Sequence, residues 1–204
     1  MHTPTSRKAE PSRPAVRGIA SAIFFLTFFG AIWGLAGITF LSGVLWVGAV
    51  VLIGLVTLVF LSVGVRLLRY ARSLPQTVTP EEAATGKRIG IWFGVVFGAE
   101  AVLVALASIL LSRFGANHFV APVIALIVGL HFLPLASLFK VRAYYLTGVV
   151  LCLLAVIAII ALLLGVPLVG PLPTHWSFFV SIGAALVLWL TLLYISRFAL
   201  RLMR

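Results

Sequence analysis

Glu100 and His131 are ionisable side chains inside long stretches that otherwise contain no acids or bases. A carboxylic acid and an imidazole can share a hydrogen bond, and apolar surroundings favour the protonated acid over the carboxylate. The two residues therefore suggest either a polar contact that joins two helices or a proton relay. In a relay, Glu100 would carry the proton and His131 would tune it or pass it on.

The stretches around these residues predict membrane-spanning helices. The chain has 204 residues, of which 63% are hydrophobic and 9% charged, and its mean hydropathy is +1.24. Soluble domains carry about 25% charged residues. Residues 18–65 and 143–196 are runs of 48 and 54 residues without a Lys, Arg, Asp or Glu. Because one spanning helix needs roughly 20 residues, each run must hold two helices.

These patterns predict an all-α, polytopic transmembrane bundle of six spans. Residues 1–16 contain three prolines and few apolar side chains, which is typical of a disordered tail, and residues 66–88 are expected to form a loop. Thr79, Pro80, Glu81 and Glu82 resemble a helix N-terminus, so a short surface helix is expected to start there. The membrane domain, residues 17–200, has expected spans at about 18–41, 44–65, 89–111, 119–139, 143–166 and 176–196.

The basic residues predict how the chain is threaded. Six spans place 14 of the 15 Lys and Arg residues on one side of the membrane and leave only Arg113 on the other. The positive-inside rule then predicts that both termini, residues 1–16 and the loop 66–88 are cytoplasmic. The net charge of +11 is therefore explained by topology and does not indicate nucleic-acid binding. Anionic lipid headgroups are the expected partners of four arginines beyond span ends, Arg66, Arg69, Arg197 and Arg201.

The expected depths of Glu100 and His131 in the membrane are similar. Glu100 lies about 11 residues, or roughly 16 Å, from the cytoplasmic start of its span. His131 lies about eight residues, or roughly 12 Å, from the cytoplasmic end of the next span. Consecutive antiparallel helices usually pack together, so we expect a hydrogen bond between these two side chains.

Pro134 lies in the same span as His131. It removes a backbone donor and crowds the carbonyl of Leu130, which loosens the helix there. Pro134 is therefore a candidate hinge, although membrane helices also tolerate proline without any functional role.

Glycines at four-residue spacing predict close helix packing. Gly30 and Gly34 have this spacing in the first span, and Gly86, Gly90, Gly94 and Gly98 have it in the third. The third helix is therefore expected to be central, with partners on two faces. A contact between copies of the chain is the functional alternative.

Motifs of known enzyme chemistry are missing from the sequence. It contains no aspartate, no Gly-x-Ser-x-Gly, no HExxH and no Walker loop, so we expect no enzyme activity and no cofactor. His118 and His175 could share a metal near the outer surface, but two histidines without carboxylates or thiols make a poor metal site, so none is expected. The single cysteine, Cys152, has no partner for an intramolecular disulfide and is expected to fill apolar space.

The block GLHFLPLASLFKVRAYYLTG, residues 129–148, resembles a segment of uncharacterised bacterial multi-pass inner-membrane proteins. The resemblance covers about a tenth of the chain and implies no activity. Together with the amino-acid usage, it implies the bacterial inner membrane.

Two functional hypotheses follow. The first is a non-enzymatic membrane protein that is structural, binds lipid or associates with itself. The second is a small transporter or proton-linked permease that uses Glu100 and His131. A cavity that reaches Glu100 would favour the permease, whereas a tightly packed interior would favour the structural role.

Overall fold

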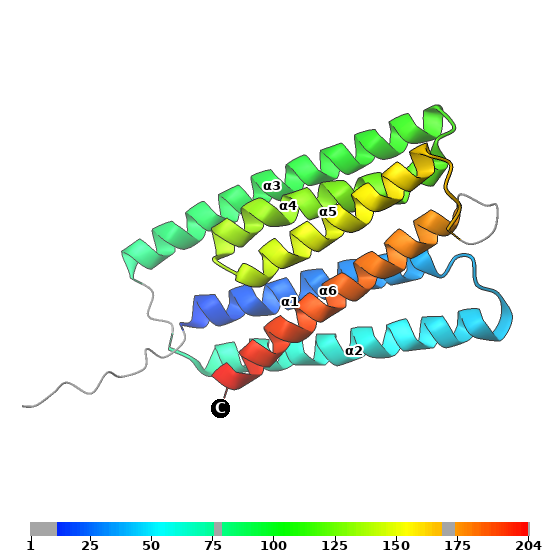
Figure 1. Ribbon diagram of the computed structural model, residues 1–204. Helices are drawn as coiled ribbons and strands as arrows, with labels where there is room; N and C mark the ends of the chain where they lie inside the picture. The colour runs from blue at the N-terminus through cyan, green and yellow to red at the C-terminus, as the bar shows by residue number, and fades with distance from the viewer. Residues whose placement is uncertain (1–11, 76–78, 169–173, 204) are drawn as a thin grey trace, which may run out of the picture.

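The computed structural model describes residues 12–75, 79–168 and 174–203 (Figure 1). All regular structure in these residues is helical, and six of the helices are long and apolar enough to cross a membrane. The predicted all-α fold with six spans is therefore confirmed. The elements are α1 (Arg13–Gly37), α2 (Gly43–Ser73), α3 (Pro80–Arg113), the 3-10 turn η1 (Asn117–Phe119), α4 (Val120–Phe139), α5 (Arg142–Leu163) and α6 (Thr174–Leu202).

Several helices extend beyond the apolar stretches that predicted them. α1 begins at Arg13, inside the segment expected to be a tail, and has a proline in its first turn. Residues 1–11 lie outside the described part of the chain. α2 runs on to Ser73 and α3 begins at Pro80, so most of the expected loop at 66–88 is helical. Hydropathy locates the part of a helix that lies in lipid, but backbone hydrogen bonding continues where the side chains become polar.

A capping box fixes the start of α3. The hydroxyl of Thr79 accepts a hydrogen bond from the Glu82 backbone N–H at 3.2 Å, and the Glu82 carboxylate accepts one from the Thr79 N–H at 2.9 Å. This arrangement satisfies two N–H groups that the first helical turn leaves free. The predicted N-terminus is correct, but the helix that starts there is the third span itself and not a separate surface helix.

The helices pack as two groups of three. α1, α2 and α6 form one group, α3, α4 and α5 form the other, and α6 joins the groups through α4 and α5 (Figure 1). α4 and α5 approach closely where Gly129 faces Gly148, since a Cβ on Gly148 would lie 2.7 Å from the Gly129 carbonyl oxygen. α5 and α6 share a buried hydrogen bond of 2.6 Å between the Thr147 and Thr191 hydroxyls.

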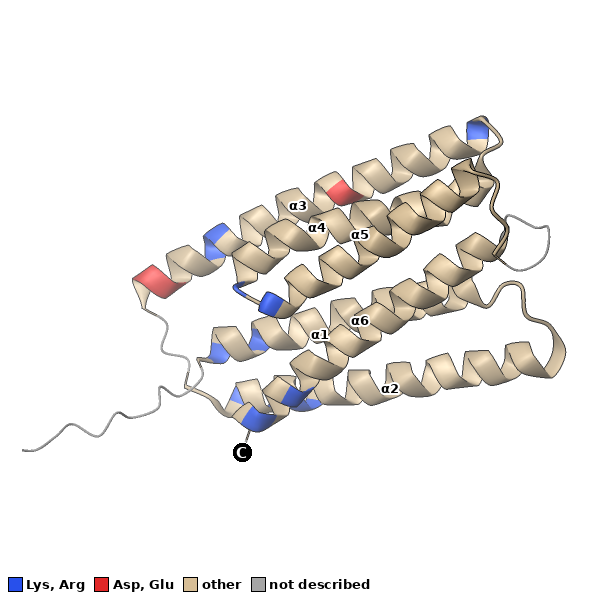
Figure 2. Cartoon of the chain, viewed as in Figure 1, with Lys and Arg blue, Asp and Glu red and all other residues tan. Residues whose placement is uncertain are grey.

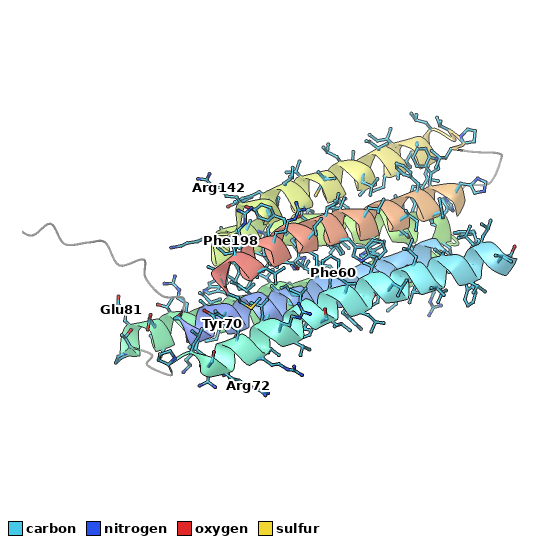
Figure 3. All side chains as sticks on the ribbon, turned by 90° about the horizontal axis from the view of Figure 1, so that it is seen from below. Phe60, Tyr70, Arg72, Glu81, Arg142 and Phe198 are labelled. Carbon is cyan, nitrogen blue, oxygen red and sulfur yellow. The ribbon has the colours of Figure 1, made fainter. Side chains whose placement is uncertain are left out.

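The alternating helix directions bring the start of α1 and the end of α6 to the same end of the bundle (Figure 1). Almost all Lys and Arg residues of the described chain also lie there, and we call it the basic end (Figure 2). Figure 3 shows Arg72, Glu81 and Arg142 at this end. Arg113 is the last residue of α3 and lies at the opposite end.

Candidate functional site

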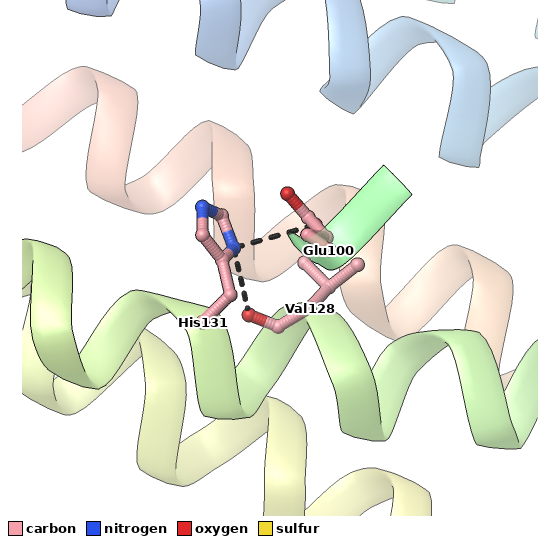
Figure 4. A network of polar contacts seen from close by, with 3 residues as sticks. All are labelled: Glu100, Val128 and His131. Carbon is pink, nitrogen blue, oxygen red and sulfur yellow. Dashed lines mark hydrogen bonds and ion pairs between the residues drawn. The ribbon is translucent and has the colours of Figure 1, made fainter. Parts of the chain in front are cut away.

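Glu100 on α3 and His131 on α4 meet inside the bundle. His131 Nδ1 lies 3.3 Å from Glu100 Oε1, which is within hydrogen-bond distance, as the sequence predicts (Figure 4). The His131 side chain is 13% exposed and the Glu100 side chain 11% exposed. The pair is therefore largely withdrawn from the surface, yet neither side chain is sealed in the core.

The His131 ring has two distinct nitrogens. Nδ1 also lies 3.2 Å from the carbonyl oxygen of Val128, one turn earlier in α4. Because a carbonyl oxygen only accepts, this contact favours a hydrogen on Nδ1, which can then be donated to Val128 or to Glu100. Figure 4 shows the other ring nitrogen, Nε2, pointing away from both oxygens. Such a ring can take up a proton at Nε2 and release another from Nδ1 to the carboxylate.

A cavity of about 1420 Å³ reaches this pair from the basic end. Its lining runs along α3 from Glu81 to Glu100 and back along α4 from Phe139 to Val128. α1 forms the opposite wall and α6 contributes four side chains. Nineteen helical steps correspond to about 28 Å, so the cavity lining extends deep into the bundle and includes the acid and the histidine. Its volume exceeds the roughly 300 to 1,000 Å³ typical of small-molecule sites.

Aromatic rings form much of the cavity wall. Phe25 of α1 makes edge-to-face contacts with Phe93 and Phe97 of α3, with ring centroids 5.7 and 5.8 Å apart. Phe93 also contacts Phe139 of α4 at 5.9 Å, and Phe29 contacts Phe97 at 6.0 Å. Further aromatic side chains that line the cavity are Trp33, Phe132, Tyr144, Tyr194 and Phe198. α1 and α3 thus face each other through phenylalanines, and α3 has no fully buried residue.

The charges around the cavity differ from those of the rest of the chain. The full sequence has 15 basic and four acidic residues. All three acids in the described residues, Glu81, Glu82 and Glu100, line this cavity, whereas its basic lining residues are Lys140 and Arg142. A protein with a strong positive charge therefore surrounds one cavity in which the acids are concentrated.

The other predicted site residues lie in separate places. Gly30 and Gly34 face Trp189 of α6, whose indole ring would lie 2.7 and 3.3 Å from a Cβ at those positions. α4 continues as a helix through Pro134, one turn from His131. Four arginines at the basic ends of α2 and α6 have no acidic partner within 4 Å in the described chain. They are Arg66, Arg69, Arg197 and Arg201.

The expectation that α3 is central is wrong for the single chain. A Cβ on Gly90, Gly94 or Gly98 would meet nothing within 4 Å, so these glycines do not pack against another helix of the described chain. Because glycines four residues apart drift around the helix, Gly86 and Gly90 line the cavity, whereas Gly94 and Gly98 do not. Glycine spacing indicates that a helix can approach a neighbour, but it does not identify that neighbour.

Sequence reasoning missed two features of this region. The phenylalanines at i and i+4, Phe25 with Phe29 and Phe93 with Phe97, carried a usable signal, since this spacing puts two rings on one helix face. The contact between Gly129 and Gly148 carried none, because each is a single glycine without a repeat. In the described residues, no group of three or more His, Cys, Asp or Glu side chains is placed to hold a metal ion.

No known protein family, no curated protein and no solved structure matches this chain. The resemblance of residues 129–148 to bacterial membrane proteins therefore stays a prediction. What the protein does has to be inferred from the cavity and its residues.

Proposed function

We propose that the protein is a small proton-linked permease in which Glu100 and His131 carry the coupling proton. The observation that carries this proposal is the cavity of about 1420 Å³ that extends from the basic end to the pair. A buried acid that only joins two helices needs no path to solvent. A proton carrier does need one, because its proton must come from water and return to water.

The proposal requires Glu100 to exist in two protonation states. His131 contacts Glu100 at 3.3 Å through Nδ1 and can stabilise its carboxylate, whereas the apolar wall favours the neutral acid. A solute that binds in the cavity can shift this balance, and proton uptake or release is then coupled to solute binding. Pro134, one helical turn away, is a candidate point for the accompanying movement of α4.

Proton flux in proteoliposomes tests the proposal. The full chain is reconstituted with a pH-sensitive dye trapped inside, and cationic, neutral and anionic solutes are added in turn. We expect at least one class to drive proton flux through the wild type, and Glu100→Gln to abolish it. Ser108→Ala is the matched control on α3, because within the described residues the Ser108 hydroxyl bonds only to the Val104 carbonyl of its own helix, and Ser108 does not line the cavity. Unchanged flux in Glu100→Gln would refute the role of the pair.

We further propose that the protein resides in the bacterial inner membrane with both termini in the cytoplasm. The collection of Lys and Arg at one end of the bundle supports this orientation (Figure 2). Reporters fused after Met203 and inserted at Ser42 test it. The first should be active only in the cytoplasm and the second only outside it, and a shared location would contradict the topology.

Self-association through α3 is a second candidate function. α3 has no fully buried residue, and Gly94 and Gly98 face open space outside the cavity lining, which would let a second copy approach closely. In a Cys152→Ala background, Gly98→Cys should form a disulfide-linked dimer in membranes. Val51→Cys on the exposed face of α2 is the control and should stay monomeric. Equal crosslinking of both would remove the support for a specific contact.

A further inference from the structure

The cavity that reaches Glu100 combines three properties that restrict what it can bind. The first is its charge: the three described acids of a chain with net charge +11 all line it. Glu81 and Glu82 lie at the basic end, at the mouth of the cavity, and Glu100 lies at its far end. A positively charged solute would therefore meet carboxylates at both ends of the path.

The second property is the aromatic wall. Phe25, Phe93 and Phe97 present ring faces and edges between α1 and α3, and Trp33 and Tyr194 extend the wall. The face of an aromatic ring carries partial negative charge and attracts cations, most strongly where water is excluded. The same rings offer a large apolar surface to a hydrophobic body.

The third property is the shortage of oxygen ligands. A small inorganic cation such as Ca²⁺ takes six to eight oxygens, and Mg²⁺ takes six. The far end of the cavity offers one carboxylate, and His131 stands beside it at 3.3 Å. The space is also far larger than a bare ion needs. The single carboxylate and the large volume suit an organic cation whose charge is shielded by aromatic or alkyl groups.

We infer that the substrate class of this permease is a hydrophobic organic cation, such as a quaternary ammonium or phosphonium compound. This inference rests on the proposed function, and it assigns Glu100 as the residue that pairs with the cationic centre. The phenylalanines of α1 and α3 hold the apolar groups. Lys140 and Arg142 also line the mouth and repel cations there, but the lining as a whole has three acids against these two bases.

Proton balance follows from this assignment. When the Glu100 carboxylic acid takes up a monovalent cation, one proton leaves the acid through His131 to water, and the net charge of the site is unchanged. His131 is the only titratable side chain that contacts Glu100 in the described residues. The other titratable groups that line the cavity are Glu81, Glu82, Lys140, Arg142, Tyr144 and Tyr194, and α1 contributes none.

Binding of two probes with matched shape and opposite charge tests the inference. Tetraphenylphosphonium and tetraphenylborate have nearly the same size and apolar surface. Each is titrated into the detergent-solubilised full chain, and binding is followed by calorimetry. We expect saturable binding of tetraphenylphosphonium that is at least about tenfold tighter than that of tetraphenylborate, because carboxylates attract the phosphonium and repel the borate. Equal binding of both probes, or tighter binding of the borate, would overturn the inference and would indicate a pocket for lipid or other apolar molecules.

Two variants locate the binding. Glu100→Gln should weaken tetraphenylphosphonium binding by about tenfold or more, because it removes the negative charge that attracts the phosphonium. Gly90→Leu supplies independent evidence if Glu100→Gln folds poorly, because a side chain at Gly90 meets no neighbour and projects into the cavity. Gly54→Leu is the matched control, since Gly54 on α2 also faces open space but does not line the cavity. Loss of binding in Gly90→Leu but not in Gly54→Leu supports the site, whereas equal binding in both overturns it.

The flux and binding experiments separate the inference from the proposed function. If anionic or neutral solutes drive proton flux that depends on Glu100, and phosphonium does not bind, the proposed permease function stands and the assignment of a cationic substrate is overturned. If phosphonium binding depends on Glu100 but no solute drives proton flux, the cation-binding site stands and the proposed permease function is overturned.

Discussion

The packed side of the bundle, where α4, α5 and α6 meet, is built from different residues than the side where α1 faces α3. On the packed side, small residues and hydroxyl groups allow close contact, as with Gly129 against Gly148 and Thr147 against Thr191. On the other side, large rings hold two helices apart and leave a cavity with acids in it. In lipid, apolar side chains alone give helices little reason to associate, so packing quality decides which helices close upon each other. The difference suggests that the packed side stabilises the fold and that the side between α1 and α3 binds a solute.

Gly148→Ala should give the largest effect on stability. The new Cβ would lie 2.7 Å from the Gly129 backbone oxygen, which cannot move without shifting α4. We expect a loss of about 1 to 3 kcal/mol in the free energy of unfolding, measured by denaturation with SDS in mixed micelles. Gly86→Ala on α3 is the matched control and should instead stabilise by up to about 1 kcal/mol, because its Cβ meets nothing. A similar loss in both variants would remove the distinction between the two sides.

Thr191→Val should give an intermediate effect. It removes the buried 2.6 Å hydrogen bond to Thr147 that joins α6 to α5. Hydrogen bonds between membrane helices contribute about 0.6 kcal/mol on average and at most about 1.7 kcal/mol, and we expect a loss in this range. A double-mutant cycle with Thr147→Val measures the coupling, and additive losses would show that the contact does not stabilise the packed side.

Glu100→Gln should give the smallest effect on stability. The amide can still accept the hydrogen bond from His131, and the residue lies beside a cavity and not in a packed seam, so we expect a change of less than about 0.6 kcal/mol in the same denaturation assay. A loss larger than that of Thr191→Val would mean that the pair serves mainly to join α3 to α4. It would then favour the structural role over the proton relay.

The spans and the Glu100–His131 pair could be predicted because both depend on strong constraints. Charge-free runs fix where lipid surrounds the chain, and consecutive antiparallel helices fix the relative depth of residues on them. The end of α2 at Ser73 was placed poorly, since polar side chains do not stop a helix that leaves the membrane. The helix start at Pro80 was predicted from its capping residues, but its continuity with the third span was not. The central position of α3 was wrong because Gly94 and Gly98 permit a contact without specifying its partner.

The cavity could not be predicted from the sequence, for a different reason. From the sequence, each phenylalanine of α1 and α3 could equally face lipid or fill a core. Only the arrangement of the helices shows that the two sets contact each other beside the cavity. Apolar residues that fill a core, face lipid or line a cavity have the same composition. Their roles separate only when distances between helices are known.

The length of α3 has a consequence for how a charged solute would reach the protein. Its 34 residues correspond to about 51 Å, which exceeds the roughly 40 to 45 Å of a bilayer including its headgroups. An untilted α3 centred on the bilayer would hold its first turn, with Glu81 and Glu82, at or beyond the edge of the headgroups. Attraction between exposed charges fades over about 8 Å at physiological ionic strength. Added salt should thus weaken the influence of Glu81 and Glu82 on an arriving cation while leaving its final affinity for the enclosed acid nearly constant.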